Sequence, residues 1–437
     1  MQLSNFFNSD FVDYASYDNL RKIGSCIDGL KNASRKVIYT VLEKNIKEPI
    51  KVSQLANKVA EFAEYLHGSL DGVVVNLGQD FTGTNNVPLL QKKGNFGTRF
   101  AQEASAPRYI FAHGSKNLFS LFKEDDLKIL VEQYFEGERI EPLFYVPTLP
   151  LILVNGSEGV SSGFAQKILS RDPKNIIKYL TNKIQKKKLN KDLLKPYFKD
   201  FKGTVEQGET ELQWLIKGKI ERTSKNQITI SELPVGYDLK TYIKVLKSLE
   251  DNGTILDWND LSDKEFKFVV KMNSKDLDKL SEDEILEKLK LVKKVTENLT
   301  CLNEKNQIQE FKNSEEILDC YFNVKMDFLG RRKKFLIDNL KKNLDILNAK
   351  IVFIKAILDK TLVIEKQPKE KIVKNLEKII TVKVQGSYDY LLNMPLYSLT
   401  LEKIKALKEN YNNTNQKLKE TEEKSLEDFW LDDLKEI

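Results

Sequence analysis

The sequence contains one tyrosine whose neighbours could make it a nucleophile. Tyr109 follows Pro107 and Arg108 in the run from Ser105 to Phe111. A free phenol has a pKa of about 10, so a tyrosine attacks a phosphodiester only if its proton is removed and the resulting charge is stabilised. Arg108 could stabilise both the phenolate and the charge that builds on the phosphate in the transition state. An isolated Arg-Tyr pair usually lies on the surface without a function. The flanking sequence must therefore show whether this pair is catalytic.

Two glycine-containing blocks flank this pair, Gly94-Asn95-Phe96-Gly97 before it and Asn155-Gly156-Ser157-Glu158-Gly159 after it. Other short blocks extend the pattern in a fixed order: Asp28-Gly29-Leu30-Lys31, Glu64-Tyr65-Leu66-His67-Gly68, Ile230-Ser231-Glu232-Leu233-Pro234 and Tyr390-Leu391-Leu392-Asn393-Met394-Pro395-Leu396. Together they resemble the breakage-reunion region of type IIA DNA topoisomerases. The resemblance covers nearly the whole chain, and the residues of these blocks are closer to those of the eukaryotic enzyme than to those of gyrase.

This resemblance implies a chemistry for Tyr109. Each of two copies would attack one DNA strand, forming a transient 5′-phosphotyrosyl link and a free 3′ hydroxyl. A second duplex would then pass through the double-strand break, and resealing would need no ATP because the ester conserves the bond energy. The implied catalytic set is Tyr109, Arg108, Arg21 and His67, in which His67 would bond the scissile phosphate or the 3′ oxygen. The other histidine, His113, has no family role.

The resemblance also suggests which residues contact DNA. The predicted phosphate contacts are the cations Lys31, Arg35, Lys36 and Arg99. Val160 stands where the family usually has isoleucine, which wedges between base pairs and bends the duplex. Valine is smaller, so we expect a gentler kink. Bacterial members have histidines at the places of Ser34 and Tyr65, which puts any contribution from those two side chains in doubt.

Composition sets limits on these expectations. The chain has 437 residues, with 70 basic and 64 acidic side chains and a net charge of +6, so any DNA site must be a local patch. The odd count of cysteines (Cys26, Cys301 and Cys320) without metal-ligand spacing argues against a disulfide framework and favours a reducing cytoplasm. Neither a signal peptide nor a membrane span is predicted. We therefore expect a cytoplasmic protein, in the host cell if the chain is phage-encoded.

Periodicity predicts an α+β multidomain fold. Residues 1–20 are predicted to be an N-terminal arm, and residues 21–154 a DNA cleavage domain. There, Ser53 is a plausible N-cap, and two apolar runs joined near Gly68 are consistent with a helix-turn-helix, which the resemblance makes a winged helix. Residues 155–300 alternate like strands between polar helices and are predicted to be a tower domain.

Residues 301–437 are predicted to be a coiled-coil stalk with a dimerisation knob. Leucine and isoleucine recur at four-and-three spacing from about residue 314 to 360. A similar spacing recurs between Ile404 and Leu418, so the two helices should pair antiparallel. The intervening residues, about 361–397, would form the knob at the far end. The resemblance implies that the knobs form an exit gate and hold a homodimer together. From the residue pattern alone, a helical bundle remains an alternative to the coiled coil.

Some parts of a complete enzyme are missing from the sequence. No Gly-x4-Gly-Lys-Ser/Thr phosphate loop occurs, and Asp276-Leu277-Asp278, the clearest Asp-x-Asp, lies in a lysine-rich helical run. We therefore predict no metal or cofactor site in this chain. Magnesium and ATP are expected from a large subunit with ATPase and Toprim-like metal-binding domains. A chain that begins just before the cleavage domain resembles the medium subunit of T-even-type phage topoisomerases.

Two other classes of function stay open at the level of sequence. A site-specific tyrosine recombinase would need several Arg and His before a tyrosine near the C-terminus, whereas Tyr109 lies in the first quarter with one upstream histidine. A non-catalytic DNA-binding coiled-coil scaffold would not need Pro107-Arg108-Tyr109. A covalent protein–DNA adduct would separate both from a topoisomerase.

Overall fold

The computed structural model describes residues 7–65 and 67–437. Part of the predicted arm, residues 1–6, and Leu66 of the Glu64–Gly68 block therefore lie outside the described residues. The chain divides into two compact units, Met1–Met326 with Leu431–Ile437 and Asp327–Trp430. The boundaries expected at residues 20, 154 and 300 all fall inside the first unit. The second unit begins inside the stalk helix, at Asp327 rather than at residue 301.

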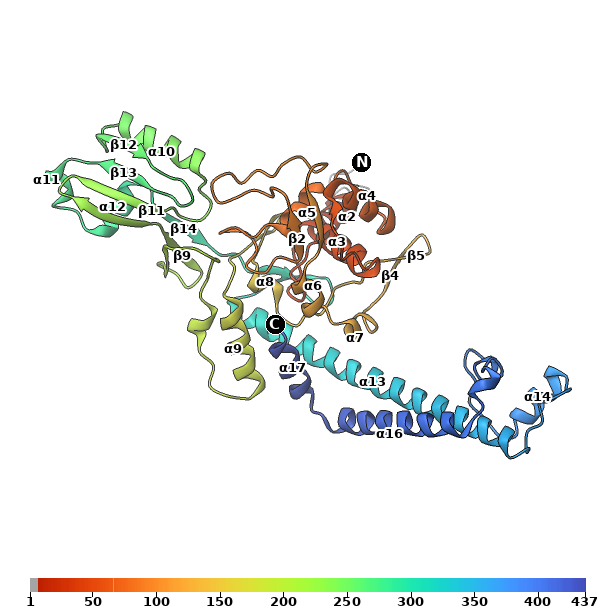
Figure 1. The fold of residues 1–437 in the computed structure, drawn as a ribbon. Helices are drawn as coiled ribbons and strands as arrows, with labels where there is room; N and C mark the ends of the chain where they lie inside the picture. The colour runs from red at the N-terminus through yellow and green to blue at the C-terminus, as the bar shows by residue number, and fades with distance from the viewer. Residues whose placement is uncertain (1–6, 66) are drawn as a thin grey trace. The chain divides into compact units, whose positions relative to one another are not determined.

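Within the described residues, the first unit opens with helices α2 to α5 around a small sheet (Figure 1). Most of the predicted arm is helix α2, which runs from Asp10 into the next predicted domain at Lys22. The other elements are α3 (Asn32–Glu43), α4 (Val52–Phe62), α5 (Asp71–Gly78), β1 (Ile50–Lys51), β2 (Leu90–Lys93) and β3 (Phe111–Gly114). The three strands are antiparallel in the order β1-β3-β2. Leu55 and Val59 recur at helical spacing on α4 and are fully buried, which fixes its inward face.

Short elements connect this group to the rest of the unit. Hairpin β6–β7 (Ser157–Val160 and Ala165–Ile168) follows the four-residue helix α8 (Leu151–Val154). The ion pair between Arg171 and Glu297 is buried beyond the hairpin, with its closest N–O distance 2.7 Å. The remaining elements are α6 (Lys116–Leu121), α7 (Glu124–Leu127), β4 (Gln133–Phe135), β5 (Glu138–Ile140), α9 (Pro173–Ile184), η1 (Lys191–Leu194), β15 (Thr300–Leu302) and β16 (Ile308–Glu310).

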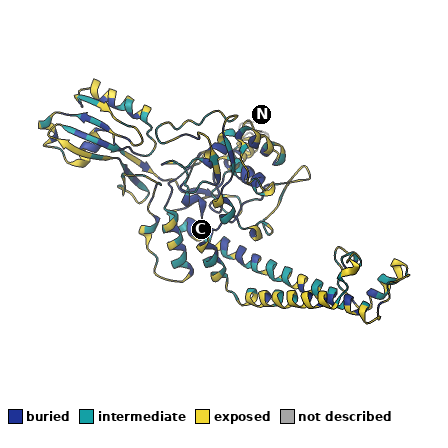
Figure 2. Cartoon of the chain, in the orientation of Figure 1, coloured by how far each residue is buried: buried dark blue, intermediate teal, exposed yellow. Residues whose placement is uncertain are grey.

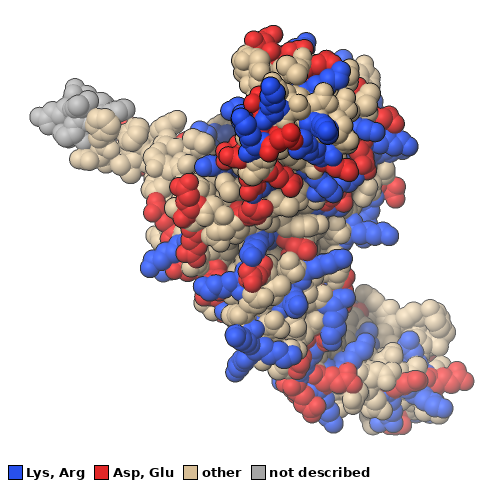
Figure 3. Space-filling model, turned by 90° about the vertical axis from the view of Figure 1, so that its left-hand side faces the viewer, with Lys and Arg blue, Asp and Glu red and all other residues tan. Residues whose placement is uncertain are grey.

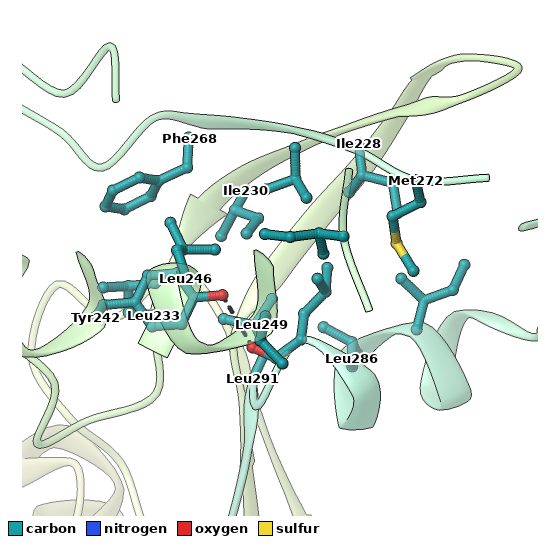
Figure 4. Packing of buried hydrophobic residues seen from close by; sticks show 14 of the residues in the cluster. Ile228, Ile230, Leu233, Tyr242, Leu246, Leu249, Phe268, Met272, Leu286 and Leu291 are labelled. Atoms are coloured by element: carbon teal, nitrogen blue, oxygen red, sulfur yellow. Dashed lines mark hydrogen bonds between the residues drawn. The ribbon is translucent and has the colours of Figure 1, made fainter. Parts of the chain in front are cut away.

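Residues 204–296 contain two antiparallel sheets with their own core. One sheet has the order β10-β11-β13-β12 and the other β14-β9-β8. Along β11, alternate residues are buried, and Ile228 and Ile230 lie in the same core as Tyr242 and Phe268 (Figure 4). The elements are β8 (Thr204–Gln207), β9 (Gln213–Lys217), β10 (Lys219–Ser224), β11 (Gln227–Glu232), α10 (Leu239–Asp251), β12 (Asp257–Asp260), β13 (Phe268–Lys271), α11 (Ser274–Leu277), α12 (Glu282–Lys288) and β14 (Val292–Thr296). The alternating pattern thus did mark strands.

The second unit is built on two long helices. Helix α13 (Ser314–Leu358) enters it at Asp327, and α16 (Leu401–Glu423) lies beside α13 in Figure 1. The pairing is antiparallel, because Lys341 bonds Glu422 at 2.9 Å while Ile354 and Ile404 share the core at the opposite end. Figure 2 shows that much of α16 is exposed. The predicted antiparallel coiled coil is confirmed.

A small helical knob joins the two long helices. Its elements are α14 (Lys369–Leu376), α15 (Asp389–Leu392) and the short turn η2 (Leu396–Ser398). Leu376, Ile380 and Leu391 are buried in one cluster with residues of α13 and α16. The final helix, α17 (Leu426–Lys435), crosses the boundary between the units.

The surface carries no segregated charge on the face shown in Figure 3, where Lys and Arg side chains are mixed with Asp and Glu. This agrees with the near balance of 70 basic and 64 acidic residues. Within the described part of the chain, no helix is both long enough and apolar enough to cross a membrane.

Candidate active site around Tyr109

Tyr109 lies on a tight turn that leads into β3. The turn is closed by a hydrogen bond from the Tyr109 N–H to the Ala106 carbonyl, with an N–O distance of 2.9 Å. On the next residue, the Ile110 carbonyl accepts from the Val52 N–H at 3.0 Å, which ties the turn to the start of α4. The backbone is thus fixed on both sides, while the Tyr109 side chain is 67% exposed. A substrate can reach the phenol directly.

Arg108 is placed to act on the phenol. Its guanidinium carbon lies 5.0 Å from the centroid of the Tyr109 ring, and the side chain is exposed. A guanidinium over an aromatic face is attracted by the ring quadrupole, and it keeps free donors for a phosphate. The structure therefore brings Arg108 and Tyr109 together at one accessible point, as the sequence predicts.

The loop before Tyr109 folds back on itself and holds the turn in place. The Asn95 carbonyl accepts from the Ser105 N–H at 3.0 Å, and the Asn95 side chain accepts from the Gly97 N–H at 2.9 Å. Gly97 has a φ of +88°, and a Cβ there would collide with the Gln102 carbonyl. A side chain at this position would open the loop, so the Gly94–Gly97 block serves to shape the approach to Tyr109.

Arg99 lies in the same loop, and its guanidinium binds backbone carbonyls of the protein instead of facing solvent. Its guanidinium donates to the carbonyls of Leu233 and Tyr237 and lies 3.6 Å from a Glu232 oxygen. Burial lowers the pKa of Arg99. The prediction that Arg99 contacts a DNA phosphate does not fit this placement, because its donors face the turn that follows β11.

Arg21 and His67 form a second group, joined by a residue that the sequence did not suggest. The Tyr17 hydroxyl bonds His67 Nε2, and the Arg21 guanidinium carbon lies 5.5 Å from the Tyr17 ring centroid. All three side chains are at least partly accessible. Among the described residues, no hydrogen bond or ring contact is found between Tyr109 and either Arg21 or His67. The four predicted residues therefore lie in two groups, Arg108 with Tyr109 and Arg21 with His67, and Tyr17 belongs to the second group.

Arg35 and Lys36 are buried, which corrects the prediction that they contact DNA. Arg35 makes a two-pronged ion pair with Asp28, with N–O distances of 2.8 and 3.0 Å. Lys36 bonds Glu141 at 2.7 Å and also the Ala63 carbonyl. Buried cations are tolerated when they are paired in this way. Both side chains hold α3 against its surroundings through bonds within the protein.

Lys31 and Val160 lie at the hairpin that follows α8. The Lys31 ammonium donates to the Glu158 carbonyl at 2.5 Å, and burial lowers its pKa. Val160 ends β6 and is 72% exposed. At Gly159, a Cβ would collide with the Lys22 carbonyl, so the hairpin packs closely against the end of α2. Val160 is therefore an apolar tip on a supported hairpin.

Helix α2 holds the tip of this hairpin. Asp18 accepts from the Ser162 N–H at 2.9 Å and from its hydroxyl at 3.1 Å, and Asn19 accepts from Ser161 at 2.5 Å. The bond with Lys22 keeps the pKa of Asp18 below its ordinary value. Neither Asp18 nor Asn19 was predicted to matter, because their partners are more than 140 residues away in the sequence.

A cleft of about 410 Å³ lies beside the Asn155–Gly159 block. Two lysines that the sequence did not single out, Lys167 and Lys293, line it together with Asn155 and Ser157. Lys167 bonds Glu158 at 3.0 Å, and Lys293 donates to the Val235 carbonyl at 3.1 Å. Both lie near the hairpin, and nothing in their local sequence sets them apart from the chain's other lysines.

Residues for a metal do not gather anywhere in the described ranges: no group of three His, Cys, Asp or Glu side chains could hold an ion there. Asp278 of the Asp-x-Asp sequence forms an ion pair with Arg222 instead. His113 lies on β3 opposite Gln91, and its Nδ1 atom is buried without a hydrogen-bond partner. These residues do not fit a magnesium site, so no step of the chemistry is assigned to a metal in this chain.

Comparison with known proteins shows the family to which this chain belongs. A family model for the A-type subunit of DNA gyrase/topoisomerase IV matches residues 21–435. The chain belongs to this family. It is 32% identical over 478 residues to the DNA topoisomerase 2 of Plasmodium falciparum and 33% identical over 476 residues to DNA topoisomerase 2-alpha of Gallus gallus.

These relatives are longer than the chain. The alignments cover 99% of this chain but only 34% and 30% of the two relatives, so the chain spans about a third of their length. A solved structure of the Plasmodium falciparum topoisomerase II DNA-binding, cleavage and re-ligation domain superposes with a TM-score of 0.88 at 31% identity. That superposition covers 99% of this chain and 63% of the other. The predicted fold class is confirmed.

Proposed function

We propose that this chain cleaves and rejoins DNA as part of an ATP-dependent type II DNA topoisomerase, with Tyr109 as the nucleophile. The observation that carries the proposal is the exposed Arg108–Tyr109 pair on a turn anchored to α4. Membership of the DNA gyrase/topoisomerase IV family supports it. The scaffold-protein alternative is disfavoured because it gives no reason for this arrangement.

The reaction follows from the groups at this turn. The Tyr109 hydroxyl releases its proton to water as its oxygen attacks a backbone phosphorus, and the bond from phosphorus to the 3′ oxygen breaks. The departing oxygen takes up a proton to become a 3′ hydroxyl, and the phosphate stays esterified to Tyr109 through its 5′ side. Arg108 offsets the negative charge that builds on the phosphate oxygens. Reversal restores the duplex, because the ester keeps the energy of the original bond.

The DNA path is proposed to run over Val160 and the cleft beside it. Val160 would insert between base pairs and bend the duplex, and Lys31, Lys167 and Lys293 would lie close to the backbone phosphates. The group of α3, α4, α5 and the three-stranded sheet would act as a winged helix in this complex. Arg21 and His67, joined through Tyr17, would contact the phosphate backbone or the 3′ oxygen.

ATP and magnesium are proposed to come from outside residues 1–437, from a large subunit with ATPase and Toprim-like domains. The relatives, which extend well beyond the matched segment, support this. The likeness to the medium subunit of T-even-type phage enzymes belongs to the same proposal, as do assembly as a homodimer and a cytoplasmic location, in the host cell if phage-encoded. Addition of the large subunit should be required for ATP-driven plasmid relaxation, and robust relaxation by the purified chain alone would contradict the proposal.

End-labelled DNA tests the cleavage chemistry. The chain, supplemented with magnesium and the large subunit, is incubated with a duplex labelled at either end of one strand and then denatured with detergent. We expect the 3′ label to migrate with the protein and the 5′ label to be released. Tyr109→Phe should abolish the adduct and leave DNA affinity within a few fold. An adduct that keeps the 5′ label, or one that persists in Tyr109→Phe, would overturn the assignment.

A further inference from the structure

Two cysteines that are 294 residues apart in sequence meet in the first unit. The Sγ atoms of Cys26 and Cys320 are 3.2 Å apart, close enough for a hydrogen bond between the thiols. A disulfide has an S–S bond of about 2.05 Å, so the sulfurs need to approach by about 1.1 Å to form one. All three cysteines of the chain are free thiols in this structure.

The two thiols of this pair differ in access. Cys26 is fully buried in the segment between α2 and α3, whereas Cys320 lies on the second turn of α13 and is partly accessible. The bond between them lowers the pKa of Cys320 and raises that of Cys26. The accessible thiol is therefore also the one that ionises more readily, which is the combination that makes a thiol reactive.

The third cysteine is arranged differently. Cys301 is buried on β15, accepts a hydrogen bond from the Gln166 side chain at 3.5 Å, and burial raises its pKa to about 12. It has no thiol within hydrogen-bond distance in the described part of the chain, so it is a natural internal control. Of the three, only the Cys26–Cys320 pair combines contact between sulfurs with access from solvent.

We propose that Cys26 and Cys320 are a reversible oxidation site at which peroxides form an intramolecular disulfide. The Cys320 thiolate attacks one oxygen of hydrogen peroxide, the O–O bond breaks, and a sulfenic acid and hydroxide result. The Cys26 sulfur then attacks the Cys320 sulfur, the S–O bond breaks, and water leaves with the Cys26 proton. In sum, two thiols and one peroxide give one disulfide and two waters. A small thiol reductant reverses the reaction by exchange.

The cross-link would fix a segment on which the candidate site depends. The Cys26 N–H donates to the Leu302 carbonyl at 2.9 Å, and two residues later Asp28 holds Arg35. Arg21 and Lys31 lie at the two ends of the same segment, on α2 and just before α3. A disulfide to Cys320 would tie this segment to the first turns of α13, limiting movement between them. Disulfides of cytosolic proteins are commonly regulatory in this way.

Mass spectrometry of the full chain tests the proposal. Exposure to a few equivalents of hydrogen peroxide should lower the intact mass by 2 Da and reduce the free thiols from three to one. A non-reduced digest should contain one cross-linked peptide that joins Cys26 to Cys320, and dithiothreitol should restore all three thiols. Cys320→Ala should abolish the cross-link, whereas the matched variant Cys301→Ala should form it at the rate of the unchanged chain.

Three outcomes would overturn the proposal. The first is a gain of 32 or 48 Da on Cys320, for sulfinic or sulfonic acid, while Cys26 stays free. The second is a cross-link that includes Cys301, and the third is a disulfide only between two copies of the chain. Each is read from the unchanged protein, so the result does not depend on whether a Cys26 variant folds or on whether Tyr109 cleaves DNA.

Discussion

The cations predicted for the candidate site are of two kinds. Some are exposed, with hydrogen-bond donors available to a ligand, and others are buried and bonded to groups of the protein. Arg108 lies over an exposed ring and has its donors available, whereas Arg35 is buried and paired with Asp28. This difference decides what each can do, since a guanidinium already paired with a carboxylate in the interior cannot also bind a phosphate. Arg108 is therefore expected to affect catalysis, and Arg35 stability.

The first prediction concerns Arg108→Ala. We expect the rate of cleavage to fall by about two to three orders of magnitude, because a lost transition-state donor costs on the order of 3 kcal/mol. Arg108→Lys should recover part of the rate, since it keeps the charge but loses the planar fork of donors. Single-turnover cleavage with the reconstituted enzyme measures this. If both variants cleave at the original rate, Arg108 has no part in the chemistry.

The second prediction concerns Arg35→Met. The substitution leaves the Asp28 carboxylate buried with backbone donors alone, and such a change typically destabilises a protein by about 3–5 kcal/mol. Urea unfolding should show this loss. The control is Lys58→Met on α4, an exposed lysine whose change should stay within about 0.5 kcal/mol. Normal stability with a specific loss of DNA affinity would instead restore the original DNA-binding prediction for Arg35.

The candidate nucleophile could be proposed from the sequence, but the burial of the neighbouring cations could not. Tyr109 and Arg108 were identifiable because adjacency alone brings them together. The burial of Lys36 and Arg99 was not, because their partners Glu141 and Glu232 lie 105 and 133 residues further along the chain. Tyr17 was missed for the same reason, since its contact with His67 spans 50 residues.

At the scale of elements, the β6–β7 hairpin depends on α2 for its position. Asp18 and Asn19 bond the loop between the strands, and Lys31 bonds the backbone of β6. Val160 therefore lies on a hairpin that hydrogen bonds hold in place, rather than on an unsupported loop. A wedge needs such support, because the force that unstacks two base pairs acts back on the element that carries the side chain.

The third prediction concerns the size of the residue at the tip. Val160→Ala should reduce DNA bending and cleavage, while Val160→Ile should increase bending, because a larger apolar wedge separates the base pairs further. Fluorescence energy transfer between the ends of a short duplex measures the bend. The matched exposed control is Val131→Ala, which should change nothing. An equal bend across alanine, valine and isoleucine would exclude the wedge.

The fourth prediction concerns the pH dependence of the hairpin support. Lys22 and Ser162 hold the pKa of Asp18 below its ordinary value of about 4, so the folded state favours the ionised carboxylate. This stabilisation is complete above that ordinary value and is lost as the pH falls through the lower, folded-state pKa. The loss of unfolding free energy in Asp18→Asn should therefore be largest near neutral pH and shrink below about pH 4. A difference that grows on acidification would contradict the assignment.

Elements were easier to predict when their pattern was long. The helix expected from about residue 314 to 360 is observed from Ser314 to Leu358, because 45 residues give the period many repeats. Short elements were less certain. Ser53, the predicted N-cap, lies inside α4, which begins at Val52. No side chain caps this helix. Instead, the Val52 and Ser53 N–H groups donate to the carbonyls of Ile110 and Pro107 in the turn that carries Tyr109. Strand β12 is defined by its pairing with β13, which the local sequence alone does not show.

At the scale of the whole molecule, the knob has an unpaired apolar surface. Leu396, Tyr397 and Leu401 are exposed to 79%, 84% and 75%. They lie in η2 and at the start of α16, next to the buried cluster around Leu391 that makes the knob a folded body. Several large apolar side chains on one folded surface indicate an interface. A second copy is the occupant that the proposed function requires, because two tyrosines must act on opposite strands.

The last prediction tests this interface in the purified chain. We expect a dimer at micromolar concentration, since two-fold pairing is the commonest oligomer geometry. The double variant Leu396→Glu with Tyr397→Glu should weaken dimerisation at least about tenfold, because two charges would be placed in a desolvated apolar contact. Leu261→Glu changes an exposed leucine between β12 and β13 and should leave the dimer intact. Sedimentation velocity over a concentration series distinguishes these outcomes, and a monomeric unchanged chain at micromolar concentration would rule out the proposed gate.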